Sequence, residues 1–246
     1  MHLAILCGLV AFCGATENKI VGGSDAENDS FPYQVSLRRK GRHVCGGSII
    51  GDDWILTAAH CIYKQRPEHY TVVAGSNLLD SGGDSYKVKE LIPHENYDPE
   101  TISNDIALIK LKQAIHVSEG VNKIELSTED VPSEVELTLS GWGMTEYPGS
   151  SPNKLQTIKL FSITNEKCAE EHPYANVTAS NICTFTKKGE GACKGDSGGP
   201  LVSFNKQVGV VSWGLPCAKG KPDVFTRVYS FLSWVADHTK SITLCD

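Results

Sequence analysis

Three stretches of the chain carry side chains that could transfer an acyl group. Ser197 lies in the sequence Gly-Asp-Ser-Gly-Gly at 195–199, where glycines permit a sharp turn and a close approach to backbone amides. A serine hydroxyl is a weak nucleophile unless a neighbouring base takes its proton. His60 follows one apolar run and Asp105 precedes another, so two strands could bring a base and a carboxylate to this serine. Taken singly, the three have simpler interpretations as an idle turn serine, a structural histidine and a turn aspartate.

Short apolar and β-branched runs predict the elements that must position these side chains. Val35 and Leu37 alternate with polar residues, which is the period of a half-buried strand. Many such runs, separated by turn residues, indicate an all-β barrel or sandwich. The further runs are 43–50, 54–58, 70–74, 106–111, 135–139, 155–160, 201–204, 208–213 and 224–228.

Helical patterns are sparse. Residues 164–171 could form two turns, capped by Thr164 or Asn165. A clearer helix is predicted after Ser230, which can cap it, because four residues recur on one helical face. These residues are Phe231, Trp234, Val235 and His238, and we expect His238 to pack or lie at the surface rather than to catalyse.

The composition limits the classes of partner. The chain has 246 residues, of which 40% are hydrophobic and 21% charged, and its formal net charge is −6. These values are ordinary for a globular protein, and the negative net charge argues against a nucleic-acid partner. We expect no cofactor, and we expect no zinc because no Cys-x-x-Cys motif with a histidine pair is present.

The N-terminus has the pattern of a secretory signal. An apolar run at 3–12 is followed by the small residue Ala15. Signal peptides usually begin with positively charged residues, and here only His2 and the terminal amine precede the run. The run is too short to span a bilayer, and no later stretch is long enough. We therefore expect a signal peptide at 1–15 and a secreted, extracellular protein with no membrane segment.

The cysteines agree with an oxidising compartment. Of nine cysteines, Cys7 and Cys13 leave with the signal, and six of the remaining seven should pair. Spacing alone does not determine which cysteines pair with which. We expect Cys245, beside the terminus, to be the one left without a partner among these seven. The others are Cys45, Cys61, Cys168, Cys183, Cys193 and Cys217.

Seven sequence blocks, in this order, resemble the chymotrypsin-type serine proteases. The resemblance runs from Ile20 to about Lys240 and is greatest to arthropod digestive chymotrypsins, to which Gly-Glu-Gly-Ala-Cys at 189–193 contributes. The blocks are Ile-Val-Gly-Gly at 20–23, Cys-Gly-Gly-Ser at 45–48, Thr-Ala-Ala-His-Cys at 57–61, Asp-Ile-Ala-Leu at 105–108, Gly-Trp-Gly at 141–143, Gly-Asp-Ser-Gly-Gly-Pro at 195–200 and Ser-Trp-Gly at 212–214.

The resemblance implies two six-stranded antiparallel β-barrels, a C-terminal helix, and a catalytic site in the cleft between the barrels. Ser197 would attack the peptide carbonyl and form an acyl-enzyme, His60 would take and return the proton, and Asp105 would orient His60. The amides of Gly195 and Ser197 would form the oxyanion hole. The backbone that pairs with substrate as an added strand would be that of Ser212, Trp213 and Gly214.

The resemblance also implies a zymogen. A trypsin-like protease would cut after Lys19, which separates a propeptide at 16–19 from a protease domain at 20–246. The new ammonium of Ile20 would then pair with Asp196, because a buried charge needs a partner. Before the cut, His43 and Ser36 match positions that can hold Asp196 in an inactive arrangement.

The disulfides that the resemblance implies are Cys45–Cys61, Cys168–Cys183 and Cys193–Cys217. Cys245 has no family partner and is either free or bridged to another chain. The resemblance further implies protein or peptide substrates, protein inhibitors among the partners, and a monomer.

The predicted specificity pocket leaves two substrate preferences open. Trypsin-like members carry an aspartate at the position of Gly191, and Gly214 leaves the pocket mouth open, so we expect cleavage after Phe, Tyr, Trp or Leu. Asp223 stands where chymotrypsins usually have glycine, and its carboxylate could reach a Lys or Arg side chain. Basic or dual specificity is therefore the alternative. Lys194, at the rim, either disfavours basic groups or is simply solvated.

Two surface features have modest interpretations. The loop at 75–84 corresponds to a calcium loop in some relatives, but Ser76 stands where a glutamate ligand is expected, so we expect no calcium site. Asn28 and Asn176 begin glycosylation sequons that a secreted chain could use.

Two other classes of protein fit part of the pattern. An α/β-hydrolase shares Gly-x-Ser-x-Gly, but its chain order is serine, acid, histidine, and only His238 follows Ser197. A non-catalytic binding homologue is the remoter alternative, since such proteins usually lack one of the three catalytic residues.

Overall fold

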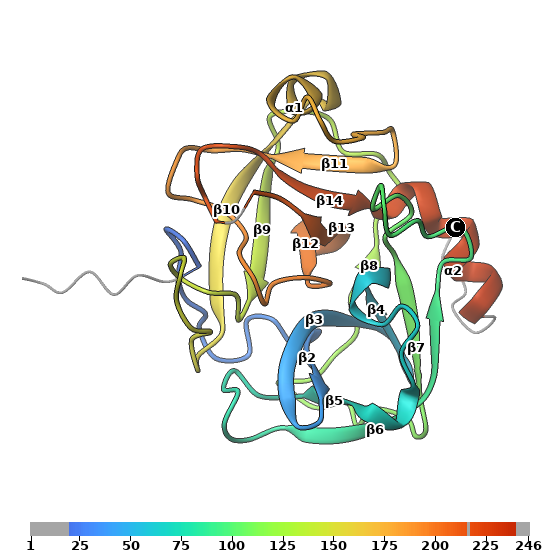
Figure 1. The fold of residues 1–246 in the computed structure, drawn as a ribbon. Helices are drawn as coiled ribbons and strands as arrows, with labels where there is room; N and C mark the ends of the chain where they lie inside the picture. Colours follow the sequence, from blue (N-terminus) through green and yellow to red (C-terminus); the bar gives the residue numbers. More distant parts are fainter. Residues whose placement is uncertain (1–19, 216, 240–246) are drawn as a thin grey trace, which may run out of the picture.

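The computed structural model describes residues 20–215 and 217–239 (Figure 1). The predicted signal peptide, the propeptide with Lys19, and Cys245 lie outside these described residues. No helix in the described part of the chain is long and apolar enough to cross a membrane.

The N-terminal half forms a closed barrel of six antiparallel strands in the order β2-β3-β4-β7-β6-β5. Its interior holds fully buried aliphatic side chains such as Leu37, Ile55 and Leu108. The strands are β2 (Gln34–Arg39), β3 (Arg42–Gly51), β4 (Trp54–Thr57), β5 (Tyr70–Ala74), β6 (Asp84–Pro93) and β7 (Ala107–Leu111).

The C-terminal half forms a second closed barrel, in which β9 pairs with both β10 and β12 and so completes the ring β9-β10-β11-β14-β13-β12. Two short strands join its sheet, β1 (Ser24–Asp25) beside β10 and β8 (Glu125–Leu126) parallel to β13. The barrel strands are β9 (Glu136–Gly141), β10 (Gln156–Ile163), β11 (Asn181–Thr184), β12 (Pro200–Ser203), β13 (Lys206–Trp213) and β14 (Asp223–Arg227). The predicted two-barrel fold is confirmed.

Two α-helices and three 3₁₀ turns complete the described chain. Helix α1 (Asn165–Glu171) is capped by Thr164, whose hydroxyl accepts from the Lys167 amide. Helix α2 (Leu232–Thr239) follows the turn η3 (Val228–Phe231), so Ser230 lies inside η3 and the prediction that it caps the helix is wrong. The other 3₁₀ turns are η1 (Ala59–Cys61) and η2 (Pro67–His69).

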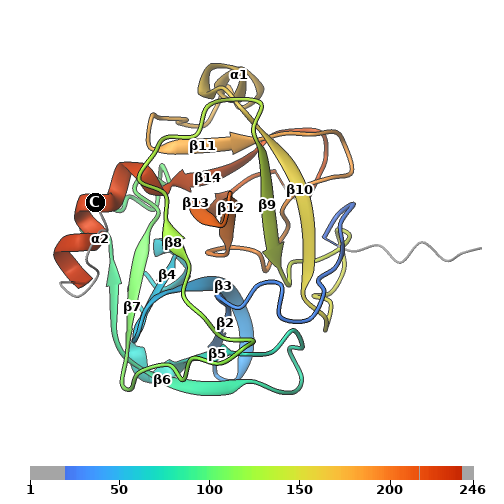
Figure 2. The same cartoon turned by 180° about the vertical axis from the view of Figure 1, so that it is seen from behind.

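Helix α2 returns the chain to the first barrel (Figure 2). Phe231 and Val235 are buried in the cluster that includes the first barrel's core. The ring of His238 packs on Trp234 with centroids 4.8 Å apart, and its Nε2 lies 3.0 Å from Glu95 Oε1. The predicted packing role of His238 therefore agrees with its contacts.

The three implied disulfides, Cys45–Cys61, Cys168–Cys183 and Cys193–Cys217, are all present. The two most exposed aromatic side chains of the described residues lie in connections of the second barrel. They are Tyr174, in the segment after α1, and Phe204, in the turn between β12 and β13.

Candidate active site

The first barrel brings His60 and Asp105 together. Strand β4 leads directly into η1, which carries His60, and Asp105 lies just before β7. Because β4 pairs with β7, with Thr57 opposite Ala107, the two segments are neighbours. Asp105 Oδ1 accepts from the His60 amide at 2.9 Å, and Oδ2 lies 2.7 Å from His60 Nδ1. The carboxylate therefore fixes both the backbone and the ring of the histidine.

The second barrel also holds Asp105. The Ser212 hydroxyl donates to Asp105 Oδ2 at 2.5 Å, and the Thr226 hydroxyl donates to the Asp105 carbonyl at 2.6 Å. Asp105 is only 1% exposed, so these polar contacts are shielded from water. The side-chain roles of Ser212 and Thr226 were not predicted, because nothing in the sequence relates strands β13 and β14 to Asp105.

Asp105 controls the protonation of His60. Burial by itself would lower the pKa of His60, but the charge of Asp105 and its hydrogen bond act in the opposite direction. The net effect raises the pKa of His60 above its usual value. With Nδ1 donating to the carboxylate, Nε2 of the neutral ring can accept a proton.

Ser197 lies at the boundary of the barrels, where Gly46 of β3 donates to the Ser197 carbonyl at 2.8 Å. Gly195, two residues earlier, has a φ of +105°, a conformation that favours glycine. His43 Nε2 donates to the Gly195 carbonyl at 3.0 Å. Among the described residues, nothing accepts a hydrogen bond from the Gly195 or Ser197 amide. Two donors are thus left for an oxyanion.

Asp196 is fully buried. Its carboxylate accepts from the amides of Gly143 at 2.8 Å and Cys193 at 2.9 Å. Burial raises the pKa of Asp196 to about 6 despite these two donors. A Cβ atom at Gly143 would overlap this carboxylate, so glycine is required there.

The predicted inactive arrangement of Asp196 is not the one in this structure. His43 Nδ1 lies 2.9 Å from the Ser36 hydroxyl, and its other nitrogen bonds Gly195 rather than Asp196. Burial also lowers the pKa of His43, which favours the neutral ring that these contacts need.

Ile20 is fully buried next to the same region. It belongs to an apolar cluster with Leu139 of β9, two residues before Gly141, where a Cβ atom would overlap Asp196. The Gly191 amide donates to the Val21 carbonyl at 3.2 Å. The segment that begins at Ile20 is therefore bonded to the loop before Ser197, and the Ile20 side chain shares a core cluster with the strand that ends at the Asp196 site.

A cavity of about 290 Å³ opens beside Ser197, and four of the predicted pocket residues, Ser212, Trp213, Gly214 and Asp223, line it, whereas Gly191 does not. Asp223 forms part of its wall, is 7% exposed, and accepts from the Ala192 amide at 2.7 Å. Burial raises the pKa of Asp223 to about 7, with a contribution from the charge of Asp196. The space next to Gly191 is filled by the Asp223 carboxylate, which any Cβ at that glycine would overlap. The lining is Ala192, Cys193, Lys194, Ser197, Val211, Ser212, Trp213, Gly214, Leu215, Cys217, Asp223 and Val224.

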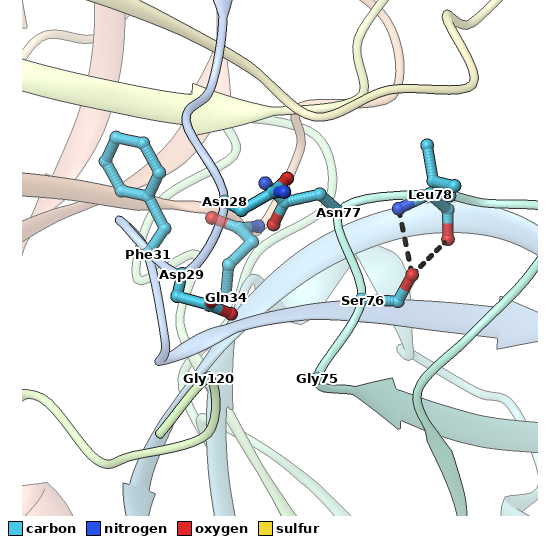
Figure 3. A pocket seen from close by; sticks show the side chains of 9 residues that line it. All are labelled: Asn28, Asp29, Phe31, Gln34, Gly75, Ser76, Asn77, Leu78 and Gly120. Carbon is cyan, nitrogen blue, oxygen red and sulfur yellow. Dashed lines mark hydrogen bonds between the residues drawn. The ribbon is translucent and has the colours of Figure 1, made fainter. Parts of the chain in front are cut away.

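A second cavity, of about 260 Å³, lies away from these residues (Figure 3). Asn28 and Asp29 line it from the segment after β1, and Ser76 and Leu78 line it from the loop after β5. The Ser76 hydroxyl bonds the backbone of Leu78 and donates to the Ser81 carbonyl at 2.7 Å. None of the predicted catalytic residues contributes to this cavity.

A metal at the histidine is excluded by its neighbours. Within the described residues, Cys45, His60 and Cys61 bring potential ligand atoms within 4.8 Å of one another. The two sulfur atoms are bonded to each other in a disulfide and are not thiolates.

Two closed barrels, with a histidine–aspartate pair held between them and a serine on a glycine turn at their boundary, are typical of the chymotrypsin-type serine endopeptidases. A sequence model of the family described as Trypsin matches residues 20–235. Chymotrypsin-2 of the hornet Vespa crabro is 46% identical over 88% of this chain and 98% of its own. Trypsin beta of Drosophila erecta is 39% identical over 90% of this chain and 89% of its own.

Among solved structures, neuropsin, a serine protease expressed in the limbic system of mouse brain, superposes with a TM-score of 0.83. It is 32% identical, and the match covers 88% of this chain and 98% of that one. The chain belongs to the trypsin family of serine proteases.

Proposed function

We propose that the protein is a secreted endopeptidase whose catalytic residues are Ser197, His60 and Asp105. The observation that carries this is Asp105, which is buried between the barrels and bonds both the His60 ring and the Ser212 hydroxyl. A fixed base of raised pKa, together with a serine on a glycine turn at the boundary of the same two barrels, is what acyl transfer needs.

The reaction follows from these contacts. His60 Nε2 takes the Ser197 proton as the hydroxyl attacks the carbonyl, and the amides of Gly195 and Ser197 stabilise the oxyanion. Each such donor contributes about 3 kcal/mol in related sites. His60 then gives the proton to the leaving amine, and water hydrolyses the acyl-enzyme by the same route in reverse.

Activation is proposed to follow cleavage between Lys19 and Ile20 by a trypsin-like protease. The signal peptide at 1–15 and the propeptide at 16–19 would be removed, which leaves the domain that begins at Ile20. The new ammonium would reach Asp196, whose burial without a cation is costly. Support comes from Ile20 itself, which is buried beside β9, the strand whose end faces Asp196.

We propose cleavage after Phe, Tyr, Trp or Leu, because the cavity is lined by Ala192, Val211 and Trp213 and has no aspartate at Gly191. A second candidate is cleavage after Lys or Arg. It is favoured by Asp223, since this carboxylate lines the cavity and bonds only one described donor, the Ala192 amide.

The test is a cleavage profile. The precursor is activated with trypsin, processing at Ile20 is verified by N-terminal sequencing, the trypsin is selectively inactivated, and cuts are mapped in a peptide library. Ser197→Ala, treated identically, is the control for residual trypsin. Cuts after Phe, Tyr and Leu support the first candidate, and cuts after Lys or Arg that disappear in Asp223→Gly support the second.

Absence of any cleavage by the correctly processed protein would contradict the proposal and favour a non-catalytic binding homologue. Labelling by a serine-directed inhibitor separates these cases, because such a binder without an active Ser197 is not labelled. Protein inhibitors of serine proteases are the partners we expect besides substrates.

A further inference from the structure

A cluster of basic side chains lies at the tip of the β2–β3 hairpin. Residues 38–42 read Arg-Arg-Lys-Gly-Arg in a chain whose net charge is −6. Arg39, Lys40 and Arg42 are exposed there, and Lys64 is exposed in the segment after η1. The Lys40 amide donates to the His69 carbonyl at 3.0 Å, which holds the hairpin against the end of η2, five residues after Lys64. We call Arg39, Lys40, Arg42 and Lys64 the basic rim.

The basic rim is not neutralised by the protein itself. No carboxylate among the described residues forms an ion pair with any of its four cations. Two neighbouring arginines, in contrast, have polar partners within the protein. Arg66 lies 3.6 Å from Glu68, and the Arg38 guanidinium donates to the Leu79 carbonyl at 2.7 Å. Two of the cations contact aromatic side chains instead, since Arg39 interacts with the Tyr70 hydroxyl and Lys64 Nζ lies 5.0 Å from the Tyr63 ring centroid. These contacts leave the positive charges of the rim without a carboxylate partner among the described residues, so the rim can attract an external anion.

The base of the same hairpin contacts the reaction centre. Gly46 donates to the Ser197 carbonyl at 2.8 Å, and His43 donates to the Gly195 carbonyl at 3.0 Å. Figure 1 shows β3 at the side of the first barrel that faces the second. A strand rises about 3.3 Å per residue, so Arg42 lies roughly 13 Å along β3 from Gly46.

The orientation of a bound peptide follows from two positions, that of His60, which protonates the leaving amine, and that of the cavity beside Ser197. The pocket and Gly214 take the part of the substrate before the cut bond, so the leaving amine lies on the side of His60 Nε2. Cys61 Sγ is 3.7 Å from this nitrogen, and its disulfide partner Cys45 is on β3. The leaving half of an extended substrate therefore runs over the disulfide and along β3 towards the rim.

Resting on the proposed endopeptidase function, we propose that the basic rim binds acidic side chains that lie about two to four residues after the cut bond. An extended peptide advances about 3.3 Å per residue, which matches the distance from the reaction centre to Arg42. Unpaired arginines bind carboxylates through paired N–H groups, and clustered cations also speed the approach of an anionic chain. The preferred substrates are protein segments with Asp or Glu on the leaving side.

The test uses peptides that share one residue before the cut bond and differ only at the second to fourth positions after it. These positions carry Glu, Gln or Lys. At low salt we expect the ratio of kcat/KM for the Glu peptide over the Gln peptide to be about tenfold, falling to about twofold in 0.5 M NaCl because salt screens exposed charges.

The double variant Lys40→Glu/Arg42→Glu should bring this ratio below one. The matched control is Lys112→Glu/Lys123→Glu, which makes the same charge change at two exposed lysines outside the hairpin. The control should keep the tenfold ratio. An equal loss in both variants would mean that net charge alone sets the preference, and would overturn the proposal.

Two further measurements distinguish a failure of the rim proposal from a failure of the proposed enzyme function. A short substrate that ends at the leaving group reports whether the activated wild-type protein is active, so its failure contradicts the proposed function. Binding of the Glu and Gln peptides to Ser197→Ala, followed by fluorescence anisotropy, needs no turnover. Equal affinities there, or a kcat/KM ratio near one in the wild type, would overturn the proposal for the rim.

Discussion

Asp196 and Asp223 are two buried carboxylates of one barrel that face different surroundings. Asp196 has two backbone donors and no contact with the cavity, whereas Asp223 has one donor and lines the cavity. Burial raises the pKa of both, to about 6 and about 7. Under the proposed function, a charge on Asp196 would pair with the new amino group of Ile20, and a charge on Asp223 would act on the substrate.

We expect substrate preference to depend on pH through Asp223. Above pH 7 its carboxylate is charged and attracts Lys or Arg, and below pH 7 it is neutral and no longer does. The ratio of kcat/KM for an Arg peptide over a Phe peptide should rise through about pH 7. His60 affects both substrates equally, so its titration cancels in this ratio. A ratio that is flat in the wild type, or equally steep in Asp223→Gly, would contradict this prediction.

Ser212 is expected to contribute to catalysis through its hydroxyl. Ser212→Ala removes the donor that lies 2.5 Å from Asp105 Oδ2. A hydrogen bond to a charged group contributes about 1.5–3 kcal/mol, so we expect kcat to fall about tenfold or more with KM little changed. Ser203→Ala, at another buried serine of the second barrel, is the control and should leave kcat unaltered. An unchanged kcat in Ser212→Ala would show that His60 alone suffices to hold Asp105.

At the scale of elements, the site depends on connections between segments that belong to different strands. The disulfide Cys45–Cys61 joins β3 to η1, and therefore joins the strand that contacts Ser197 to the turn that carries His60. The disulfide Cys168–Cys183 joins α1 to β11, outside the residues that form the catalytic site. The two bridges close loops of nearly equal length, 16 and 15 residues.

These two bridges make a matched comparison. Replacing either pair by alanine should lower the free energy of unfolding by a similar amount, about 3 kcal/mol, because loop length sets the entropy of closure. Urea unfolding in a Ser197→Ala background measures this loss. In the active background, kcat should fall steeply only when Cys45 and Cys61 are replaced. Equal losses of kcat at equal stability would mean that the first bridge has no special effect on His60.

Short buried strands were predictable, and strands with a mixed pattern were not. The apolar runs of β4 and β7 are buried along nearly their whole length, so composition alone identifies them. Strand β6 was missed because its first half offers only Tyr86 and Val88 to the core, between charged or polar residues. Strand β11 was missed because four residues between turns give too little pattern.

Some residues of the candidate site were likewise predictable from the sequence, and others were not. His60, Asp105 and Ser197 were found because their flanking residues form recognisable blocks. The hydroxyls of Ser212 and Thr226 were not, since their partner Asp105 is more than a hundred residues away and only the closing of the barrels brings them together. The placement of Asp223 against Gly191 likewise depends on a tertiary contact that spacing does not reveal.

At the scale of the whole molecule, activation is expected to change the pH dependence of stability. In the uncut chain the amino group of Ile20 is part of a peptide bond, so Asp196 has no cation. Its pKa of about 6 lies above the ordinary value near 3.9. A raised pKa in the folded state stabilises the protein at low pH, and this stabilisation is lost as pH rises from about 4 through 6.

The uncut protein should therefore lose about 3 kcal/mol relative to the cut protein between pH 4 and pH 7. In the cut form the Ile20 ammonium holds the pKa of Asp196 down, so this loss does not occur. Because the charge of Asp196 contributes to the pKa of Asp223, the comparison is made in an Asp223→Gly background, which removes this second titrating group. Urea unfolding of cut and uncut Ser197→Ala protein measures the difference, and parallel pH curves would refute the pairing.

The closed barrels also limit which segments of one activated molecule another copy could bind and cleave. A protease of this architecture takes its substrate as an extended strand, and both edges of every barrel strand are already occupied. Phe204 is exposed in the two-residue turn between the paired strands β12 and β13, whereas Tyr174 is fully exposed in the longer connection from α1 to β11. Under the proposed specificity for aromatic residues, we expect self-digestion to begin after Tyr174, so that this connection, rather than the stability of the barrels, would set the working lifetime of the activated enzyme.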